Sequence, residues 1–284
     1  LKLTVFALAL SMCYVANAQI TKPAPSPAGS VSSKVGLADV SVDYSRPKMK
    51  GRKIFGEGSD FLVPYGQLWR TGANQGTIFT TSMDLSVKGN ALPAGEYMIL
   101  SVPGASSWEV IFYTDKSIGG NMNAFKKENE LFRVSVPAGK RTETVEALTF
   151  NISDLSADNT TGHLELAWEN TSVKVELKND FDKVVMAQIE ANTKVNVGNY
   201  LAAANYYFET GRDLDQAIKW IDMYIAENPN QFWNIHTKAQ MLAKKGDKKG
   251  AKATAEKSIE LAEKNPGGDF GYIKRNKDLI ASLK

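Results

Sequence analysis

The apolar residues of this chain change their spacing near residue 179. From about Val40 to Leu177 they alternate with a period of two, which predicts β-strands. After Asn179 the period becomes 3.6 residues, which predicts amphipathic helices. The sequence therefore predicts an α+β multidomain protein, in which an antiparallel β-sandwich over residues 36–179 precedes an α-helical domain over residues 180–284.

Three segments indicate how the predicted sandwich is layered. Residues 96–102 and 108–113 are apolar on both faces, as in central strands that are covered on both sides. Residues 148–153 alternate between apolar and polar side chains, which is typical of a strand with one face in water.

A β-hairpin is predicted late in the sandwich, because apolar residues alternate along both of its arms, 163–168 and 173–178. Charge favours one register of the two arms. The preferred register places Trp168 opposite Val175, and it pairs Glu169 with Lys174 and Glu165 with Lys178.

The helical region shows an internal repeat. Gly211 and Gly246 stand 35 residues apart, and Ala217 and Ala251 stand 34 apart. This spacing is typical of tetratricopeptide-type helical hairpins, although the match to that motif is partial. We therefore expect a tetratricopeptide-like repeat domain, with one helix at about 180–195 before the repeats and another at about 269–283 after them.

The first residues have the pattern of an export signal. Lys2 precedes an apolar stretch, and Ala16-Asn17-Ala18 matches the small residues that signal peptidase requires. We expect a signal peptide over residues 1–18, cleaved before Gln19, and then a flexible linker rich in proline and serine over residues 19–35. The single cysteine lies inside the signal, and no later stretch is long enough to span a bilayer. The mature protein is thus expected to lack disulfides and transmembrane segments.

Three motifs in the β region carry a family resemblance: Val42-Asp43-Tyr44-Ser45-Arg46-Pro47, Lys50-Gly51-Arg52-Lys53-Ile54-Phe55-Gly56 and Trp69-Arg70-Thr71-Gly72-Ala73-Asn74. Over residues of about 35–180 the chain resembles a family of exported proteins of Gram-negative bacteria that is catalogued as domain of unknown function 2911. The resemblance implies a location in the periplasm or cell envelope and often an attached helical repeat tail. It implies no activity and no catalytic residues.

Six residues of these motifs carry cationic, aromatic or amide groups: Tyr44, Arg46, Arg52, Trp69, Arg70 and Asn74. If the strands bring them together, the guanidinium groups and rings would form a binding site for an anionic ligand such as a carboxylate, a sulfate or a sugar acid. The alternative is structural, with the arginines stacked on rings or paired with Asp43 or Glu96. The sequence leaves both interpretations open.

The sequence gives little support for a metal site, a catalytic site or a nucleic-acid partner. His163 and Glu165 share one strand face, but the only other histidine, His236, lies in the helical region, so no metal site is predicted. Motifs for nucleophilic catalysis or nucleotide binding are missing, so neither a catalytic residue nor a cofactor is predicted. A net charge of +3, from 34 basic and 31 acidic residues, does not indicate a nucleic-acid partner.

The helical region has more aromatic residues than two short hairpins need for packing. We predict that a protein partner binds its groove through Tyr200, Tyr207, Trp233 and His236. The first hypothesis for function is an exported, envelope-associated binding or scaffold protein. The alternative is a hydrolase that acts on envelope or polysaccharide material through carboxylates of the sandwich.

Overall fold

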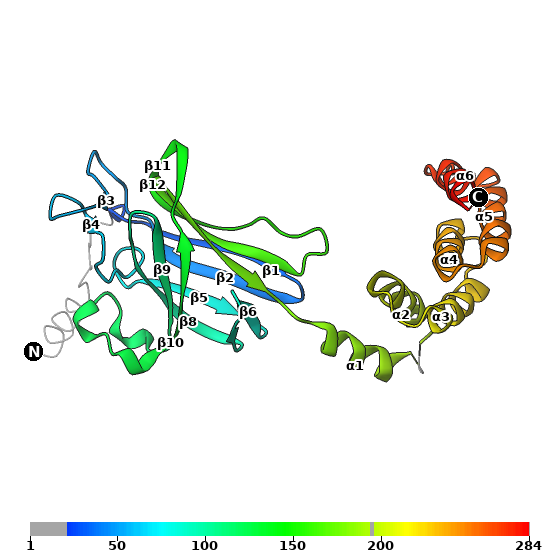
Figure 1. Ribbon diagram of the computed structural model, residues 1–284, viewed down its shortest axis with the longest axis horizontal. Coiled ribbons are helices and arrows are strands. Elements are labelled where there is room, and N and C mark those ends of the chain that lie inside the picture. Colours follow the sequence, from blue (N-terminus) through cyan, green and yellow to red (C-terminus); the bar gives the residue numbers. More distant parts are fainter. Residues whose placement is uncertain (1–21, 194–195, 284) are drawn as a thin grey trace, which may run out of the picture. The chain divides into compact units, whose positions relative to one another are not determined.

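The computed structural model describes residues 22–193 and 196–283, which divide after Phe181 into a β unit and a helical unit (Figure 1). The predicted signal peptide, residues 1–18, and the first residues of the predicted linker, 19–21, lie outside the described residues. In the described ranges, no helix combines the length and the apolar composition that a bilayer crossing requires.

The first sheet of the β unit has six strands in the order β1-β2-β5-β8-β9-β10, and each neighbouring pair is antiparallel. Their bounds are β1 (Ala28–Val35), β2 (Ala38–Ser45), β5 (Thr77–Thr81), β8 (Gly95–Val102), β9 (Ser107–Tyr113) and β10 (Glu130–Pro137). This antiparallel sheet, followed by six helices among the described residues, confirms the predicted α+β class.

The second sheet has the order β11-β12-β6-β7 and is also antiparallel. Its strands are β11 (Gly139–Ser153), β12 (Thr161–Lys178), β6 (Leu85–Val87) and β7 (Asn90–Leu92), and a separate short parallel pair joins β3 (Phe55–Gly56) to β4 (Val63–Pro64). Side chains of both sheets share one buried cluster, which includes Phe79 and Trp108 from the first sheet and Leu166 and Trp168 from the second. The two sheets thus pack face to face as a sandwich.

Within β12 the chain reverses its direction. The backbone N–H of Asn179 donates to the carbonyl of Thr160 at 3.0 Å, although these residues flank a span that would be roughly 60 Å long if it were straight. Glu169 adopts a positive φ of 55°, as turns require. The predicted hairpin is therefore present inside β12.

The predicted register of this hairpin is wrong. Lys174 contacts Asp154 at 2.6 Å and Glu165 at 3.9 Å, whereas the Glu169 carboxylate accepts a hydrogen bond from the backbone N–H of Ile54. The tight turn at Glu169 sets the register, and its geometry outweighs cross-strand charge pairs, which contribute only about 0.2–1 kcal/mol each.

The predicted flexible linker is also wrong from Ala28 onward, because β1 begins there and pairs with β2 along its whole length. Val31 and Val35 point toward the core, and Ser30, Ser32 and Lys34 are exposed. Because β1 is rich in serine, its alternation of inward and outward side chains does not appear as an alternation of apolar and polar residues. Only residues 22–27 of the described part of the predicted linker lack a strand or helix.

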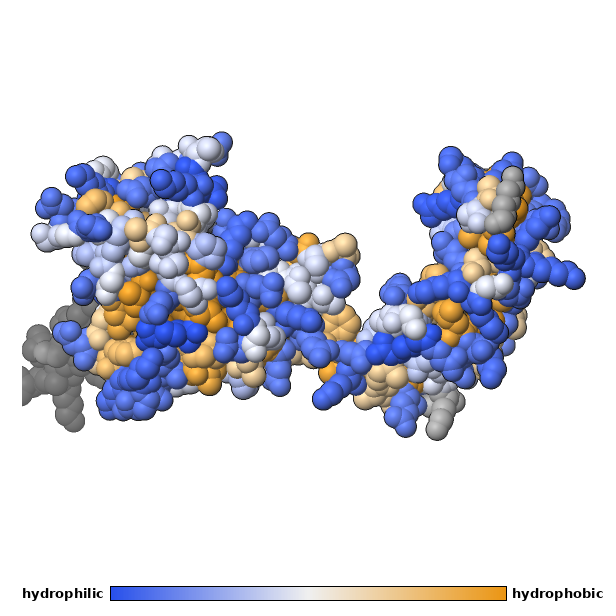
Figure 2. Space-filling model, in the orientation of Figure 1, coloured by the Kyte–Doolittle hydropathy of each residue, from blue (hydrophilic) through white to orange (hydrophobic). Residues whose placement is uncertain are grey.

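Strands β8 and β9 are buried on both faces, as predicted. Met98, Leu100, Ile111 and Tyr113 form a second buried cluster on the side that faces away from the sandwich core. The segment with three short 3-10 turns, η1 (Lys116–Ile118), η2 (Met122–Ala124) and η3 (Lys127–Asn129), packs on this cluster through Ile118, Met122, Ala124 and Phe125. Figure 2 shows hydrophobic residues at the surface of this part of the β unit, but the four cluster residues themselves are fully buried.

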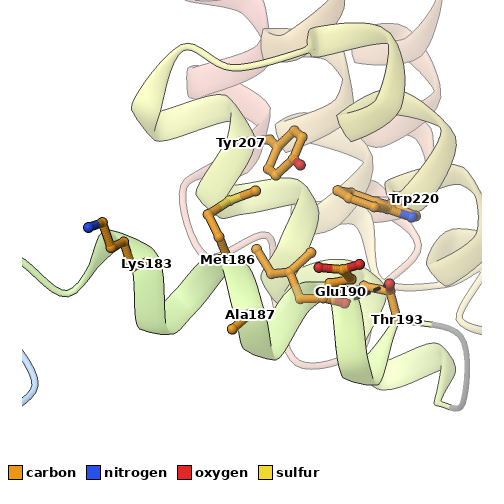
Figure 3. Close-up of a pocket in the computed structure, with 8 residues that line it drawn as sticks. Lys183, Met186, Ala187, Glu190, Thr193, Tyr207 and Trp220 are labelled. Carbon is orange, nitrogen blue, oxygen red and sulfur yellow. Dashed lines mark hydrogen bonds between the residues drawn. The ribbon is translucent and has the colours of Figure 1, made fainter.

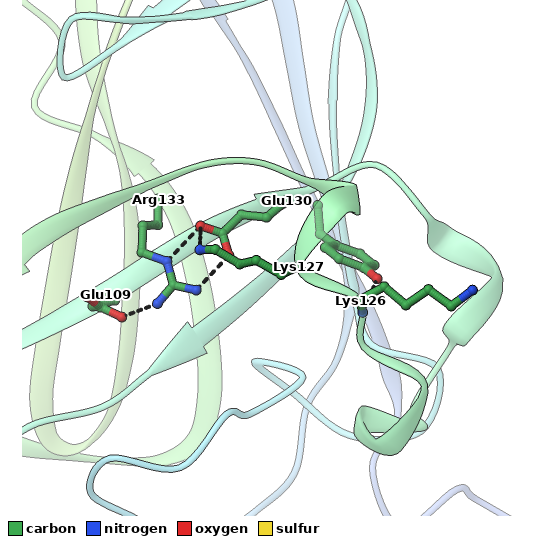
Figure 4. A network of polar contacts seen from close by, with 6 residues as sticks. Glu109, Lys126, Lys127, Glu130 and Arg133 are labelled. Atoms are coloured by element: carbon green, nitrogen blue, oxygen red, sulfur yellow. Dashed lines mark hydrogen bonds and ion pairs between the residues drawn. The ribbon is translucent and has the colours of Figure 1, made fainter.

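An ion-pair network fixes the end of this covering segment (Figure 4). The Arg133 guanidinium donates two hydrogen bonds to the Glu130 carboxylate, at 2.7 and 2.5 Å, and it also bonds to Glu109. Lys127 donates to the same Glu130 carboxylate, whose side chain is only 5% exposed. The hydrogen bonds from Arg133 lower the pKa of Glu130 below its ordinary value.

Glu130→Gln is expected to make the stability of the β unit less sensitive to acid. Because the pKa of Glu130 is lower in the folded state than in the unfolded chain, its carboxylate stabilises the fold at neutral pH, and this contribution is lost as the pH falls through about 4 and below. Denaturant unfolding at pH 7 and pH 3 measures the difference. Glu128→Gln, at an exposed neighbour, should keep the acid sensitivity of the unmodified chain. Equal pH dependence in both variants would contradict this assignment.

The helical unit contains α1 (Asp182–Asn192), α2 (Val197–Thr210), α3 (Leu214–Glu227), α4 (Phe232–Lys245), α5 (Lys248–Glu263) and α6 (Tyr272–Ser282). Successive helices from α2 to α6 pack on one another (Figure 1). Gly211 and Gly246 end α2 and α4 with φ of 70° and 93°, a conformation that favours glycine. The glycine spacing in the sequence therefore reflects two equivalent helix ends.

Candidate functional site

The predicted anion-binding residues at the end of β2 are engaged in the fold. The Tyr44 hydroxyl accepts a hydrogen bond from the backbone N–H of Phe150, which belongs to the second sheet. Arg46 donates to the carbonyl of Leu148 at 3.3 Å and to the Thr149 hydroxyl at 3.2 Å. These bonds join the end of β2 in the first sheet to β11 in the second, so Arg46 has a structural role here.

Trp69 belongs to an aromatic cluster between the sheets. Its ring lies parallel to that of Trp168 at 6.0 Å and edge-on to Phe55 and Trp108. Its indole N–H donates to the carbonyl of Gly72 at 3.2 Å. Trp69 thus contributes to core packing.

The remaining three predicted residues, Arg52, Arg70 and Asn74, form hydrogen bonds that fix loop segments of the β unit. Arg70 donates to the carbonyl of Gly120 at 2.9 Å, and Arg52 donates to the carbonyls of Met49 and Lys48. Asn74 donates to the Ser45 hydroxyl at 3.0 Å and to the carbonyl of Ser26 at 3.3 Å. Backbone carbonyls, and not the expected carboxylates Asp43 and Glu96, are the main partners. The contacts of all six residues thus favour the structural alternative over an anion site.

His163 and Glu165 lie in a partly buried network of charges on the outer face of the second sheet. Glu165 contacts Arg141 at 3.4 Å, and His163 lies 3.9 Å from Asp154, which Lys174 neutralises. Across residues 22–193 and 196–283, no cluster of three or more histidine, cysteine or acidic side chains is arranged to hold a metal ion. The network has the contacts of a polar sheet face.

The helical unit carries an open groove of about 630 Å³ between α1 and the α2–α3 hairpin. Met186 and Ile189 of α1 line one side of it, and Tyr207 of α2 and Trp220 of α3 line the other. In Figure 3, the Met186 side chain points toward Tyr207, and the Glu190 carboxylate lies below Trp220. The wall is therefore mainly apolar, with Lys183 and Glu190 as its two charged residues.

The groove exists because α1 covers α2 only in part. Asp182, at the start of α1, accepts a hydrogen bond from the Tyr206 hydroxyl at 2.5 Å and forms an ion pair with Arg212. The bond from Tyr206 lowers the pKa of Asp182, so the contact is made by a carboxylate. No residue of α1 is fully buried, and Tyr207 and Trp220 stay partly exposed at the edge of the helical core. A helix that packed tightly on the N-terminal end of the helical stack would have buried both rings.

A family model described as a protein of unknown function, DUF2911, matches residues 26–177. The chain belongs to the DUF2911 family. The match covers every strand from β1 to β12 except the last residue of β12, so the DUF2911 domain includes the strand that the sequence had indicated as linker. No curated protein and no solved structure matches the chain.

The predicted partner-binding residues all lie outside the DUF2911 domain, and the structure separates them. Tyr207 lines the groove beside α1, whereas Tyr200, on α2, is not among the lining residues. His236 is 7% exposed and lines a different groove, between α4 and α6. Trp233 is 37% exposed and contacts Phe232. Sequence reasoning identified aromatic residues of the helical unit but could not assign them to separate surfaces.

Sequence reasoning also missed Met186 and Ile189, the α1 side of the groove. The sequence predicts a helix at about 180–195 before the repeats, and a helix that packs tightly on the end of a repeat stack would bury such residues. One signal was available, since Val184, Val185, Met186 and Ile189 do not form the single apolar stripe that a tightly packed helix needs.

Proposed function

We propose that this DUF2911 protein is an exported binding protein of the Gram-negative cell envelope, and that its helical unit binds a segment of a protein partner. The signal-like residues 1–18 and the family resemblance support the location. The two equivalent glycine-capped helix ends, 35 residues apart, support a tetratricopeptide-like hairpin stack, an architecture that commonly recognises peptides.

The observation that carries this proposal is the apolar groove beside α1. Its volume of about 630 Å³ suits several side chains of a peptide. Tyr207 and Trp220 contact each other edge to face at 4.9 Å, which holds both rings in place before a partner arrives. Large aromatic residues in such positions commonly supply most of the binding free energy.

The groove also indicates what the partner presents. Met186, Ile189 and the two rings favour aliphatic or aromatic side chains. Lys183 and Glu190 put one ammonium and one carboxylate group on the lining, so together they favour neither a basic nor an acidic neighbour. The partner is therefore an apolar segment.

Trp220→Ala is expected to weaken peptide binding about 30-fold, because loss of a central aromatic anchor costs about 2 kcal/mol or more. Peptides selected on the intact chain from a random display library provide the ligands, and fluorescence titration measures the affinity. Trp233→Ala, the same change at an exposed position away from this groove, should leave the affinity unchanged. Selected peptides that bind both variants equally would contradict the assignment.

A photo-crosslinking amino acid at Ala187, an exposed residue that lines the groove, tests the proposal in the native envelope. We expect it to crosslink one protein, and Trp220→Ala should abolish that crosslink. The same amino acid at Ala253, exposed on α5, is the matched control. Identical crosslinks from both positions would argue against a role for this groove.

A further inference from the structure

A small cavity lies inside the DUF2911 domain, between the two sheets of the sandwich. Its volume is about 10 Å³, and every residue that lines it is at most 5% exposed, so it belongs to the interior. The wall from the second sheet is apolar and includes Phe150 and Leu164. The rest of the lining includes three polar side chains, those of Thr71, Ser101 and Trp108. The cavity is separate from the proposed peptide site, which lies in the helical unit.

The Trp108 side chain carries a buried donor that no protein group accepts. Two other tryptophans of the aromatic cluster donate their indole N–H to a backbone carbonyl. Trp69 donates to Gly72 at 3.2 Å. Trp168 donates to Glu146 at 3.3 Å. The indole N–H of Trp108 is buried as well, but it has no hydrogen-bond partner among the described residues. Because an unpaired buried donor is unfavourable, a group that accepts from this N–H would stabilise the core.

The two hydroxyl groups of the lining can accept further hydrogen bonds. Thr71 Oγ1 and Ser101 Oγ lie 2.9 Å apart and share one hydrogen bond. The Thr71 hydroxyl also donates to the carbonyl of Trp69 at 3.3 Å. Its single proton is used in that bond, so the Ser101 hydroxyl donates to Thr71 Oγ1. Both hydroxyl oxygens therefore keep a lone pair for another donor.

Strand pairing brings the indole ring and the two hydroxyls to the same part of the core. Ser101 of β8 pairs with Val110 of β9, so Trp108, two residues before Val110, is its diagonal neighbour on the same sheet face. Thr71 is held beside them by the bridge between Trp69 and Ser101. Thr71 has a positive φ of 54°, which is rare for a β-branched residue. The fold thus keeps the Thr71 hydroxyl in the core although its backbone is strained.

We propose that this cavity binds one water molecule, which accepts a hydrogen bond from the indole N–H of Trp108 and donates to the hydroxyl oxygens of Thr71 and Ser101. A single water needs about 10–15 Å³, so a cavity of about 10 Å³ admits one water and nothing larger. Buried waters commonly make about three hydrogen bonds, which is the number available here. The water connects the motif of residues 69–74 to β9, so Thr71 has a role that its position in the sequence does not reveal.

A high-resolution crystal structure of the full chain tests the proposal directly. We expect one density peak in the cavity, within hydrogen-bonding distance of Trp108 Nε1 and of the Thr71 and Ser101 hydroxyl oxygens. The proposal is overturned if the cavity contains no density peak while the surrounding side chains keep this arrangement. It is also overturned if the Trp108 N–H donates to a protein group.

Proton NMR of the full chain provides an independent measurement in solution. The indole proton of Trp108, assigned through its loss in Trp108→Phe, should show a nuclear Overhauser effect to water. The indole proton of Trp168 is the matched control and should show none, because this ring is equally buried but donates to the carbonyl of Glu146.

Two substitutions at Thr71 test the hydroxyl contact. Thr71→Val replaces the hydroxyl by a methyl group, and it should reduce the Trp108 cross peak to water by about half or more, because the water loses one of its three partners. Thr71→Ser keeps the hydroxyl and should keep the cross peak. Equal signals at the Trp108 and Trp168 indole protons, no signal at Trp108, or a signal that Thr71→Val leaves unchanged would each contradict the proposal.

Discussion

Trp168→Ala is expected to lower the free energy of unfolding of the β unit by about 3–5 kcal/mol. The side chain is 1% exposed and packs between Trp69 and Phe55, so its removal leaves a cavity that the two sheets cannot close without losing their own contacts. The loss also leaves the carbonyl of Glu146 without the hydrogen bond from the indole N–H. The midpoint of thermal unfolding should fall by roughly 6–20 °C.

Hydrogen exchange followed by mass spectrometry locates this effect along the chain. Peptides of β8, β9 and β12 should lose protection, while peptides of α4 and α5 should keep theirs, because the core of the sandwich and that of the helical stack are separate. Trp233→Ala, the same chemical change at an exposed position, should shift the midpoint little. Comparable losses from both substitutions would mean that Trp168 is not a central core residue.

Asn276→Leu is expected to destabilise the α4–α6 part of the helical unit by about 2–4 kcal/mol. Leucine has the same branched arrangement of side-chain heavy atoms, but it removes the acceptor of His236 Nδ1–H and one donor to the Ser258 hydroxyl. Both groups are buried, so water cannot replace the lost bonds at no cost. Exchange rates of amides in α4, α5 and α6 measure the local loss of stability.

A double replacement separates lost hydrogen bonds from lost packing. Combining His236→Phe with Asn276→Leu removes donor and acceptor together, and such paired apolar replacements are often close to neutral. We expect the double variant to be more stable than Asn276→Leu alone. A double variant that shows the summed cost of the two single changes would contradict the buried-network interpretation.

The parts of the fold that depend on hydrophobic spacing could be predicted from sequence. The central strands β8 and β9, the wet face of β11 and the change to helices after Asn179 all follow from local apolar patterns. β1 could not be recognised, because serine and glycine dominate it and its stability comes from pairing with β2. Sheet pairing is a tertiary interaction that composition does not report.

The candidate sites were less predictable, because they depend on which groups are already satisfied. The sequence shows that Arg46 and Arg70 are cationic, but not that each donates to a backbone carbonyl, that of Leu148 or that of Gly120. It shows His236, but not that Asn276, forty residues away, fixes its tautomer. Distances along the chain carry no information on such pairings.

The outer strands of the six-stranded sheet have a consequence for the protein at high concentration. β1 carries serine hydroxyls and the Lys34–Asp39 ion pair, and β10 carries Arg133 and ends in Pro137, which has no N–H to offer. A strand of another chain that paired with β1 or β10 would have to remove these polar groups from water. Beside Pro137 it would also lack one backbone hydrogen bond. The sheet is therefore a poor template for fibril growth.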